Sequence, residues 1–195
     1  MSGLQPAVFL DRDGTLNVDA GYLDCKERLI LFPWSVESVR LLRRAGYAVV
    51  VVTNQSGVAR GMIEESFVEE VHQIIQSQLS DVGEALDGHY YCPHEPSASV
   101  AEFRVDCECR KPKPGMVTRA ARDLGLDVER SVVIGDKWSD IRLAKQAGAR
   151  GVLVRTGYGR SQEKTPQEGL SADAVVDTLM DAVSWILRYP VPVNQ

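Results

Sequence analysis

An apolar run at residues 7–10 that ends in two closely spaced carboxylates, Asp11 and Asp13, constrains the fold more than any other feature of this sequence. Four consecutive apolar residues are typical of a strand buried on both faces, as in a parallel sheet. Gly14 then lets the backbone turn away from the strand. Two carboxylates beside a buried strand are costly unless a cation lies between them, and a hard ion such as Mg²⁺ takes oxygen ligands. The pattern therefore predicts a metal site here, with an ordinary acidic turn as the alternative.

The rest of the chain alternates short apolar runs with segments of helical periodicity. Runs typical of strands occupy residues 47–52, 88–91, 131–134, 151–154 and 174–176, and helical spacing marks residues 35–45, 64–79, 116–124, 139–147 and 181–188. This alternation predicts an α/β fold, a Rossmann-like parallel sheet with helices on both faces. Ser35 and Ser139 are predicted N-caps, and His72, beside the apolar stripe of its helix, is predicted to be a surface or boundary histidine rather than a ligand.

No shift in composition marks a linker, so residues 1–195 are predicted to form a single domain that ends in a short tail at residues 191–195. The segments between the strands are too short to hold a large cap domain. A site at the sheet edge would then be covered only by loops, one of them the segment Asp19, Ala20, Gly21 and Tyr22.

Polar clusters follow several of these strands at the point where each strand or its loop ends. They are Asp11 and Asp13, the turn Thr53, Asn54, Gln55 and Ser56, the pair Arg110 and Lys111, and the group Asp136, Lys137 and Asp140. In parallel α/β folds, ligands bind beyond the carboxyl ends of the strands. The clusters are therefore expected to converge on one site, and a hydroxyl-rich turn there is suited to hold phosphate.

Carboxylates, cations and hydroxyls together suit phosphoryl transfer, which needs a nucleophile, a metal ion and positive groups around the phosphoryl oxygens. Asp11 would attack phosphorus, and Asp13 would protonate the leaving alkoxide and then activate water. Asp136 would complete the Mg²⁺ site with these two aspartates. Thr53 and Lys111 would hold the transferring group, and Lys137 lies close enough in sequence to touch a phosphate.

A second cluster combines three cysteines with a histidine. Cys92 and His94 precede a twelve-residue loop that is followed by Cys107 and Cys109. Three thiolates and one imidazole form a set that Zn²⁺ binds tetrahedrally in structural sites, so residues 92–109 are predicted to form a zinc-stapled loop. A chance cluster of buried cysteines is the alternative, and Cys25 is an ordinary thiol.

These motifs resemble those of the haloacid dehalogenase-like (HAD) phosphatases over roughly residues 7–156. The family signature appears in order as Asp11-Arg-Asp-Gly-Thr15, Thr53, Lys111 and Gly135-Asp136 with Asp140. The resemblance implies that Asp11 is the nucleophile, that Asp13 is the general acid and base, and that the main-chain carbonyl of Asp13 helps to coordinate Mg²⁺. It leaves open whether Asp140 binds the metal directly or contacts only the residues that surround the metal.

Cys-Pro-His, Cys-x-Cys-Arg-Lys-Pro and Gly-Asp-Lys together are similar to one HAD subgroup, the D-glycero-D-manno-heptose-1,7-bisphosphate 7-phosphatases. The resemblance implies a small phosphorylated sugar as substrate, recognised by Arg110 and the loop at residues 19–22, and a role in making the activated heptose of lipopolysaccharide core. Histidinol-phosphate phosphatases share the subgroup signature and remain an alternative. A zinc-stapled binding module with an inactive site is a further one.

The charge balance argues against nucleic-acid partners, because the formal net charge is −5 and there is no long run of Lys or Arg. No stretch approaches the roughly 18 consecutive apolar residues of a membrane span. The N-terminus has no basic segment followed by a long apolar one, so a cytoplasmic location is expected. We also expect a monomer.

Overall fold

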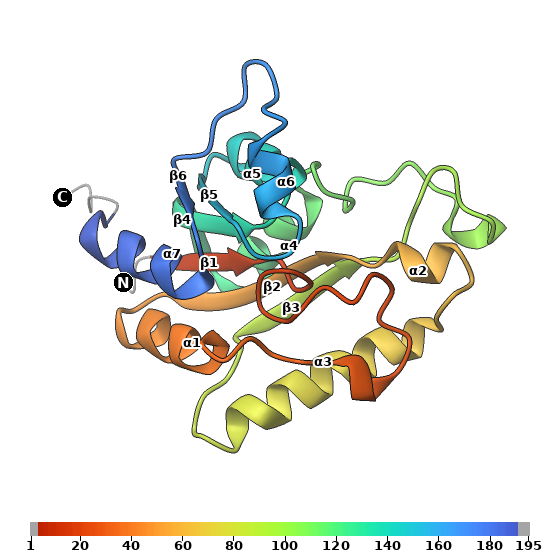
Figure 1. Cartoon of the computed structure of the whole chain (residues 1–195), viewed down its shortest axis with the longest axis horizontal. Helices are drawn as coiled ribbons and strands as arrows, with labels where there is room; N and C mark the ends of the chain where they lie inside the picture. Colours follow the sequence, from red (N-terminus) through yellow and green to blue (C-terminus); the bar gives the residue numbers. More distant parts are fainter. Residues whose placement is uncertain (1–3, 191–195) are drawn as a thin grey trace.

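A computed structural model describes residues 4–190, and the predicted tail at 191–195 lies outside the described residues. Six strands form one sheet in the order β3-β2-β1-β4-β5-β6, and every neighbouring pair is parallel (Figure 1). The strands are β1 (Gln5–Leu10), β2 (Ala48–Asn54), β3 (Gly88–Cys92), β4 (Leu126–Gly135), β5 (Arg150–Val154) and β6 (Ala174–Val176). The predicted parallel sheet is confirmed.

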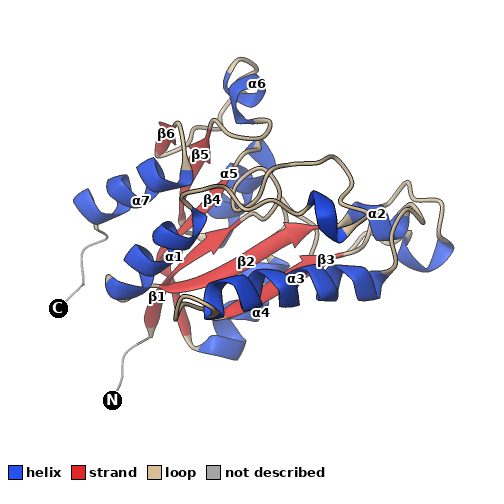
Figure 2. Ribbon diagram, turned by 60° about the horizontal axis from the view of Figure 1, so that its bottom comes forward, coloured by secondary structure: helices blue, strands red, loops and turns tan. Residues whose placement is uncertain are grey.

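Helices lie on both faces of the sheet, also as predicted (Figure 2). The helices are α1 (Ser35–Arg44), α2 (Ser56–Ala59), α3 (Glu65–Ser80), α4 (Gly115–Leu124), α5 (Trp138–Ala147), α6 (Gly159–Glu163) and α7 (Leu179–Arg188), with short 3₁₀ turns at Lys26–Arg28 and Ala101–Phe103. Helices α1, α3 and α7 contribute to one hydrophobic core, and α4 and α5 to the other.

Alternation along the central strand explains why residues 7–10 are all apolar. Val8 and Leu10 pack into the core under α1, α3 and α7, whereas Ala7 and Phe9 pack into the core under α4 and α5. Successive side chains of a strand point to opposite faces, and here both faces are covered. All four side chains are fully buried.

Three local predictions are wrong, and each has a visible cause. Ser35 is the first residue of α1 rather than its N-cap, because its buried hydroxyl donates a hydrogen bond to the carbonyl of Leu16 at 2.6 Å. Helix α5 begins at Trp138, one residue before the predicted cap Ser139. His72 is buried at 2% exposure, not at the surface, because α3 lies against the sheet.

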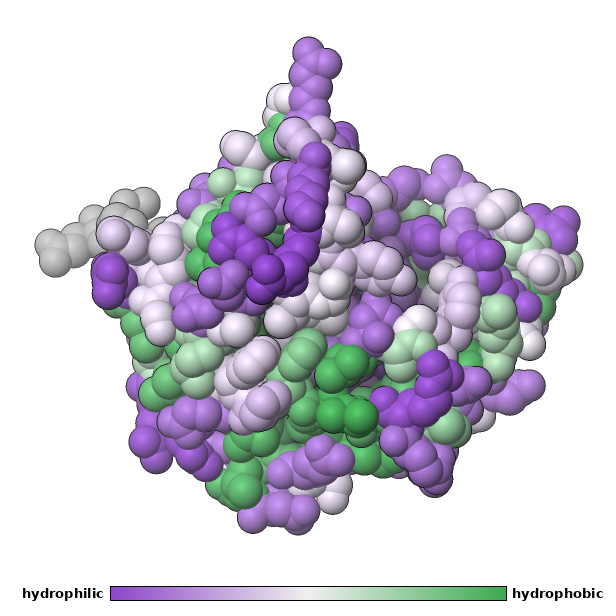
Figure 3. Space-filling view, viewed as in Figure 1, coloured by the Kyte–Doolittle hydropathy of each residue, from purple (hydrophilic) through white to green (hydrophobic). Residues whose placement is uncertain are grey.

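The carboxyl end of the sheet is covered by loops. Within residues 4–190, only a 3₁₀ turn and α1 lie between β1 and β2, and only α2 and α3 lie between β2 and β3, so the predicted absence of a large cap domain holds there. Apolar side chains gather on the face of the molecule in front of the β1–α1 loop (Figure 3), and Val18, Tyr22 and Ile30 of this loop are exposed. Strand order reverses between β1 and β4, where α/β folds place their ligand sites.

Candidate active site

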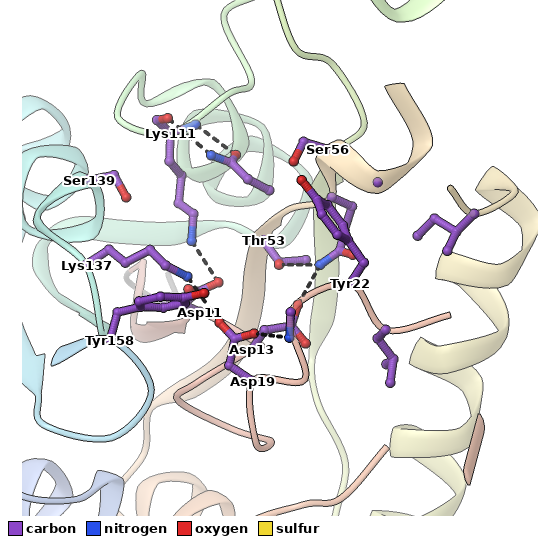
Figure 4. A pocket seen from close by; sticks show the side chains of 16 residues that line it. Asp11, Asp13, Asp19, Tyr22, Thr53, Ser56, Lys111, Lys137, Ser139 and Tyr158 are labelled. Carbon is purple, nitrogen blue, oxygen red and sulfur yellow. Dashed lines mark hydrogen bonds and ion pairs between the residues drawn. The ribbon is translucent and has the colours of Figure 1, made fainter. Parts of the chain in front are cut away.

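A cavity of about 290 Å³ opens at this reversal point, beyond the carboxyl ends of β1 and β2 (Figure 4). Most of the predicted site residues line it: Asp11, Asp13, Asp19, Gly21, Tyr22, Thr53, Asn54, Gln55, Ser56, Lys111 and Lys137. Four segments that are distant in sequence are thus brought together, as the strand-end pattern predicted. Ala20, Arg110 and Asp136 are not among the described residues that line the cavity.

Lys111 joins two carboxylates at the base of the site. Its ammonium lies 2.8 Å from Oδ1 of Asp11 and 2.7 Å from Oδ1 of Asp140, and it also donates to the carbonyl of Val52 at 3.1 Å. Burial favours the neutral amine, but Asp11 and Asp140 outweigh it and raise the pKa of Lys111 above its usual value. A fixed positive charge therefore lies beside the Asp11 carboxylate.

The carboxylate of Asp13 accepts hydrogen bonds from several side chains that the sequence analysis did not predict as its partners. The guanidinium of Arg12 bonds both oxygens, at 3.2 Å from Nε and 2.9 Å from Nη2. Asn17 and Gln55 each donate a further bond at 2.9 Å. Burial alone would raise the pKa of Asp13, but Arg12 and these hydrogen bonds lower it below its usual value. A buried arginine between two aspartates has no periodic signal, so Arg12 was missed.

Asp136 is fully buried, and only one of its two carboxylate oxygens accepts a hydrogen bond. Its Oδ2 accepts a hydrogen bond from the backbone N–H of Tyr158 at 2.8 Å, whereas Oδ1 has no hydrogen-bond partner among residues 4–190. Oxygens of Asp11, Asp136 and Asp140 lie within 4.8 Å of one another. Burial, followed by the charge of Asp11, raises the pKa of Asp136 to about 7. Apart from the Lys137 ammonium at 3.5 Å, the buried Oδ1 has no described partner, and its place among other carboxylates suits a bound cation.

Two glycines make this packing around Asp136 possible. Gly14 and Gly157 both have positive φ, +85° and +53°, a region that residues with a Cβ rarely adopt. A Cβ at either position would collide with Oδ2 of Asp136. The turn after β1 and the loop after β5 are therefore pressed directly onto the carboxylate, which fixes its orientation.

The side-chain amides of Asn54 and Gln55, at the carboxyl end of β2, bind neighbouring residues of the site. Asn54 bonds the backbone of Lys111 twice, accepting from its N–H at 3.0 Å and donating to its carbonyl at 3.2 Å. Gln55 donates from Nε2 to both Oγ1 of Thr53 and Oδ2 of Asp13, each at 2.9 Å. Both side chains thus hold neighbouring residues, a use that the sequence pattern did not distinguish from direct substrate contact.

Lys137 lies at the rim of the cavity. Its ammonium is 3.6 Å from Asp19 and 3.5 Å from Asp136, and it sits over the ring of Tyr158 at 4.7 Å from the centroid. The surrounding carboxylates outweigh burial and raise its pKa, so the group stays positive. Tyr158 and Ser139 line the cavity without having been predicted, because neither belongs to a recognisable motif.

The four predicted zinc ligands form a tight cluster outside this cavity. Sγ of Cys109 lies 3.1 Å from Sγ of Cys92 and 3.2 Å from Sγ of Cys107, and 3.3 Å from Nδ1 of His94. These sulfur–sulfur distances far exceed the roughly 2.05 Å of a disulfide. The hydrogen bond between Cys109 and Cys92, with those to Cys107 and His94, lowers the pKa of Cys109 to about 5. The arrangement fits the predicted zinc-stapled loop.

Arg110 points to that loop. Its guanidinium donates to the carbonyl of His94 at 2.9 Å and pairs with the carboxylate of Glu95. The structure thus places Arg110 on the loop that follows β3, and its recognition of substrate remains a prediction.

Comparisons with known proteins place the chain in a family. A family model described as HAD-hydrolase-like matches residues 108–182. The D-glycero-beta-D-manno-heptose-1,7-bisphosphate 7-phosphatase of Escherichia coli K12 is 43% identical over 188 residues, covering 96% of each chain. The chain belongs to the HAD-like phosphatases. The Yersinia pestis enzyme of the same name is 44% identical and covers 90% of this chain and 92% of its own.

Solved structures agree with this family. D,D-heptose 1,7-bisphosphate phosphatase from B. bronchiseptica, complexed with magnesium and phosphate, matches with a TM-score of 0.83 and 32% identity, covering 94% of this chain and 98% of its own. HAD-like phosphatases of this kind are phosphoric monoester hydrolases, as the motifs predicted. In the part of the chain that the structure describes, no helix is both long and apolar enough to cross a membrane.

Proposed function

We propose that this protein hydrolyses the 7-phosphate of D-glycero-β-D-manno-heptose 1,7-bisphosphate. The observation that carries the proposal is the identity of 43% over 96% of the chain with a relative of that name. The catalytic side chains expected from the family motifs also meet in one cavity large enough for a small phosphorylated sugar.

We propose Asp11 as the nucleophile that attacks phosphorus and forms an aspartyl-phosphate. Its Oδ1 lies against the Lys111 ammonium, and Oδ2 is left to reach the substrate. Lys111 would hold the equatorial oxygens of the phosphoryl group together with the Thr53 hydroxyl. Asp140 pairs with the same ammonium and accepts the backbone N–H of Lys137 at 3.1 Å. We therefore assign Asp140 to positioning Lys111.

Asp13 would donate a proton to the leaving oxygen and would then accept a proton from the attacking water. Its lowered pKa in the unliganded site favours the base role. The acid role requires the arriving phosphate dianion to offset the charge of Arg12. Gln55 donates hydrogen bonds to both Asp13 and Thr53. It would therefore position the proton-transfer carboxylate and the phosphoryl-binding hydroxyl relative to each other.

The acidic groups fit Mg²⁺, because Asp136 has a buried oxygen that accepts no hydrogen bond from residues 4–190 and belongs to a group of three carboxylates. We propose Asp11, Asp136 and the main-chain carbonyl of Asp13 as the protein ligands. When bound, the ion would offset the negative charge between the nucleophile and the phosphoryl group. For Cys92, His94, Cys107 and Cys109 we propose a structural Zn²⁺, since four soft ligands leave no position for a substrate.

Phosphate release across a panel of substrates tests the function. The panel contains the α and β anomers of heptose 1,7-bisphosphate, histidinol phosphate and p-nitrophenyl phosphate, with Mg²⁺ present. We expect the highest kcat/KM for the β-heptose bisphosphate, with a product that keeps its 1-phosphate. Asp11→Asn is the matched inactive control. A preference for histidinol phosphate would move the protein to the other substrate class of the subgroup.

A further inference from the structure

The chain has three histidines, and two of them meet at a place that no catalytic step uses. His94 belongs to the cysteine cluster. His72 lies on α3 and His89 on β3, the edge strand of the sheet. Their ring centroids lie 4.2 Å apart, with the ring planes tilted by 52° to each other. Helix α3 runs along the face of the sheet next to β3 (Figure 2).

A carboxylate completes this group. Glu69 precedes His72 by three residues, so both side chains lie on one face of α3. Nε2 of His89 lies 3.1 Å from Oε2 of Glu69. One ligand atom from each of the three residues falls within 4.8 Å of the others. Two imidazoles and one carboxylate thus converge from two elements.

His72 has no protein partner to account for its burial. Its ring is 2% exposed, and neither ring nitrogen has a hydrogen-bond partner among the described residues. Buried polar side-chain atoms are satisfied in the large majority of cases, so an orphaned imidazole calls for a ligand. An imidazole without a hydrogen-bond partner keeps a ring-nitrogen lone pair available to a metal ion.

The local charge also favours a cation. Glu65 lies one helical turn before Glu69 and accepts the hydroxyl hydrogen of Tyr91 at 3.0 Å. Two arginines lie in this region, and both are paired: Arg12 with Asp13, and Arg119, which lines the cavity beside the group, with Asp123. Glu69 and His89 are partly exposed, with side-chain exposures of 44% and 39%, which leaves a path from solvent. A 590 Å³ cavity lined by both residues opens beside them.

We propose that Glu69, His72 and His89 form a second metal site, for a divalent transition-metal ion of the Zn²⁺ class. Imidazole nitrogen suits such ions better than Mg²⁺ or Ca²⁺, and two histidines with one glutamate are a known three-ligand set that leaves a fourth position to water. A bound ion would tie α3 to the open edge of the sheet. The site is independent of the function proposed above.

Metal counting with the whole protein tests the site. Protein that already holds its cysteine-bound zinc is equilibrated with Zn²⁺ in excess Mg²⁺, so that the aspartate site is occupied, and zinc per chain is measured. We expect wild type to bind one more ion per chain than His89→Ala or Glu69→Gln. Loss of a ligand should weaken this ion by more than the roughly 10–100-fold that loss of an outer hydrogen-bond partner costs. Zn²⁺ should raise the melting temperature of wild type but not that of His89→Ala or Glu69→Gln.

Glu70→Gln is the matched control, because Glu70 is the next residue of α3 and pairs instead with Lys26. It should bind the extra ion like wild type. Titration with Co²⁺ adds a spectroscopic check, since nitrogen and oxygen ligands give visible bands without thiolate charge transfer. Equal zinc content in wild type, His89→Ala and Glu69→Gln would overturn the proposal, as would thiolate bands for the added Co²⁺.

Discussion

The active site and the cysteine loop are both clusters of metal-ligand side chains, but they differ in how far the protein itself satisfies them. In the active site, Asp11 and Asp140 are paired with Lys111, and Asp13 is paired with Arg12. In the loop, Cys92, Cys107 and Cys109 contact mainly one another and His94.

This difference teaches that the two regions should respond differently to loss of metal. Internal ion pairs hold the active-site carboxylates in place, so we expect Mg²⁺ to be required for the chemistry more than for the fold. Among residues 4–190 the thiols have no comparable cation partner, so we predict that the loop depends on a bound Zn²⁺ for stability. The predictions below test this contrast, from the largest expected effect to the smallest.

Asp11→Asn should abolish turnover, with a loss on the order of 10⁴-fold or more, because an amide cannot attack phosphorus. The fold should persist, since Lys111 keeps its pair with Asp140. Steady-state kinetics and thermal melting measure the two effects. Substantial activity, once deamidation has been excluded by mass spectrometry, would refute the covalent mechanism.

Asp13→Asn should lower kcat by roughly 10²–10⁴-fold through loss of general acid and base catalysis. It should also destabilise the protein more than Asp11→Asn, because it leaves the guanidinium of Arg12, 2% exposed, without its carboxylate. Breaking a buried pair in this way costs about 3–5 kcal/mol. Denaturant unfolding of both variants gives the comparison, and equal stability would show that Arg12 finds another partner.

Cys107→Ser should lose the zinc of the loop and lower both the melting temperature and the activity. Elemental analysis should find about one zinc fewer per chain than in wild type. Cys25→Ser is the matched control, because Cys25 lies outside the cluster. Protein purified without chelators that contains no zinc at all would refute the cluster.

Arg110→Ala should have the smallest effect on the chemistry itself. If Arg110 recognises the substrate, the variant loses far more kcat/KM for heptose 1,7-bisphosphate than for p-nitrophenyl phosphate. Its bonds to His94 and Glu95 suggest a role in holding the loop as well. Equal losses on the two substrates would assign Arg110 to the loop alone.

The sequence predicted the sheet, its helices and the convergence of the strand-end clusters, because strands that are buried on both faces appear in the sequence as uninterrupted runs of apolar residues. It also predicted the grouping of Cys92, His94, Cys107 and Cys109, since metal-ligand types are rare enough to stand out. It failed where an interaction joins distant segments through ordinary residues. Arg12 beneath Asp13 and Asn54 on the backbone of Lys111 are examples.

His72 shows the same limit in another form. It lies beside the apolar stripe of its helix and is a polar residue type, so the pattern placed it at the surface or the boundary of the core, whereas packing of α3 on the sheet buried it. Ser35 has the residue type of a helix cap, but its hydroxyl donates a hydrogen bond to the carbonyl of Leu16 in the turn after β1. In both cases the tertiary environment, which no local pattern records, decided the outcome.

The backbone bonds from Asn54 to Lys111 have a mechanical consequence. Only one residue separates Lys111 from Cys109, and two residues of extended chain reach no more than about 7 Å. The cysteine cluster and the Lys111 ammonium therefore belong to one short segment. Cys109 fixes this segment at one end, and the two hydrogen bonds between Asn54 and the backbone of Lys111 fix it at the other. A displacement of Cys109 would therefore shift Lys111 and disturb its contact with Asp11, although no side chain of the active site has been changed.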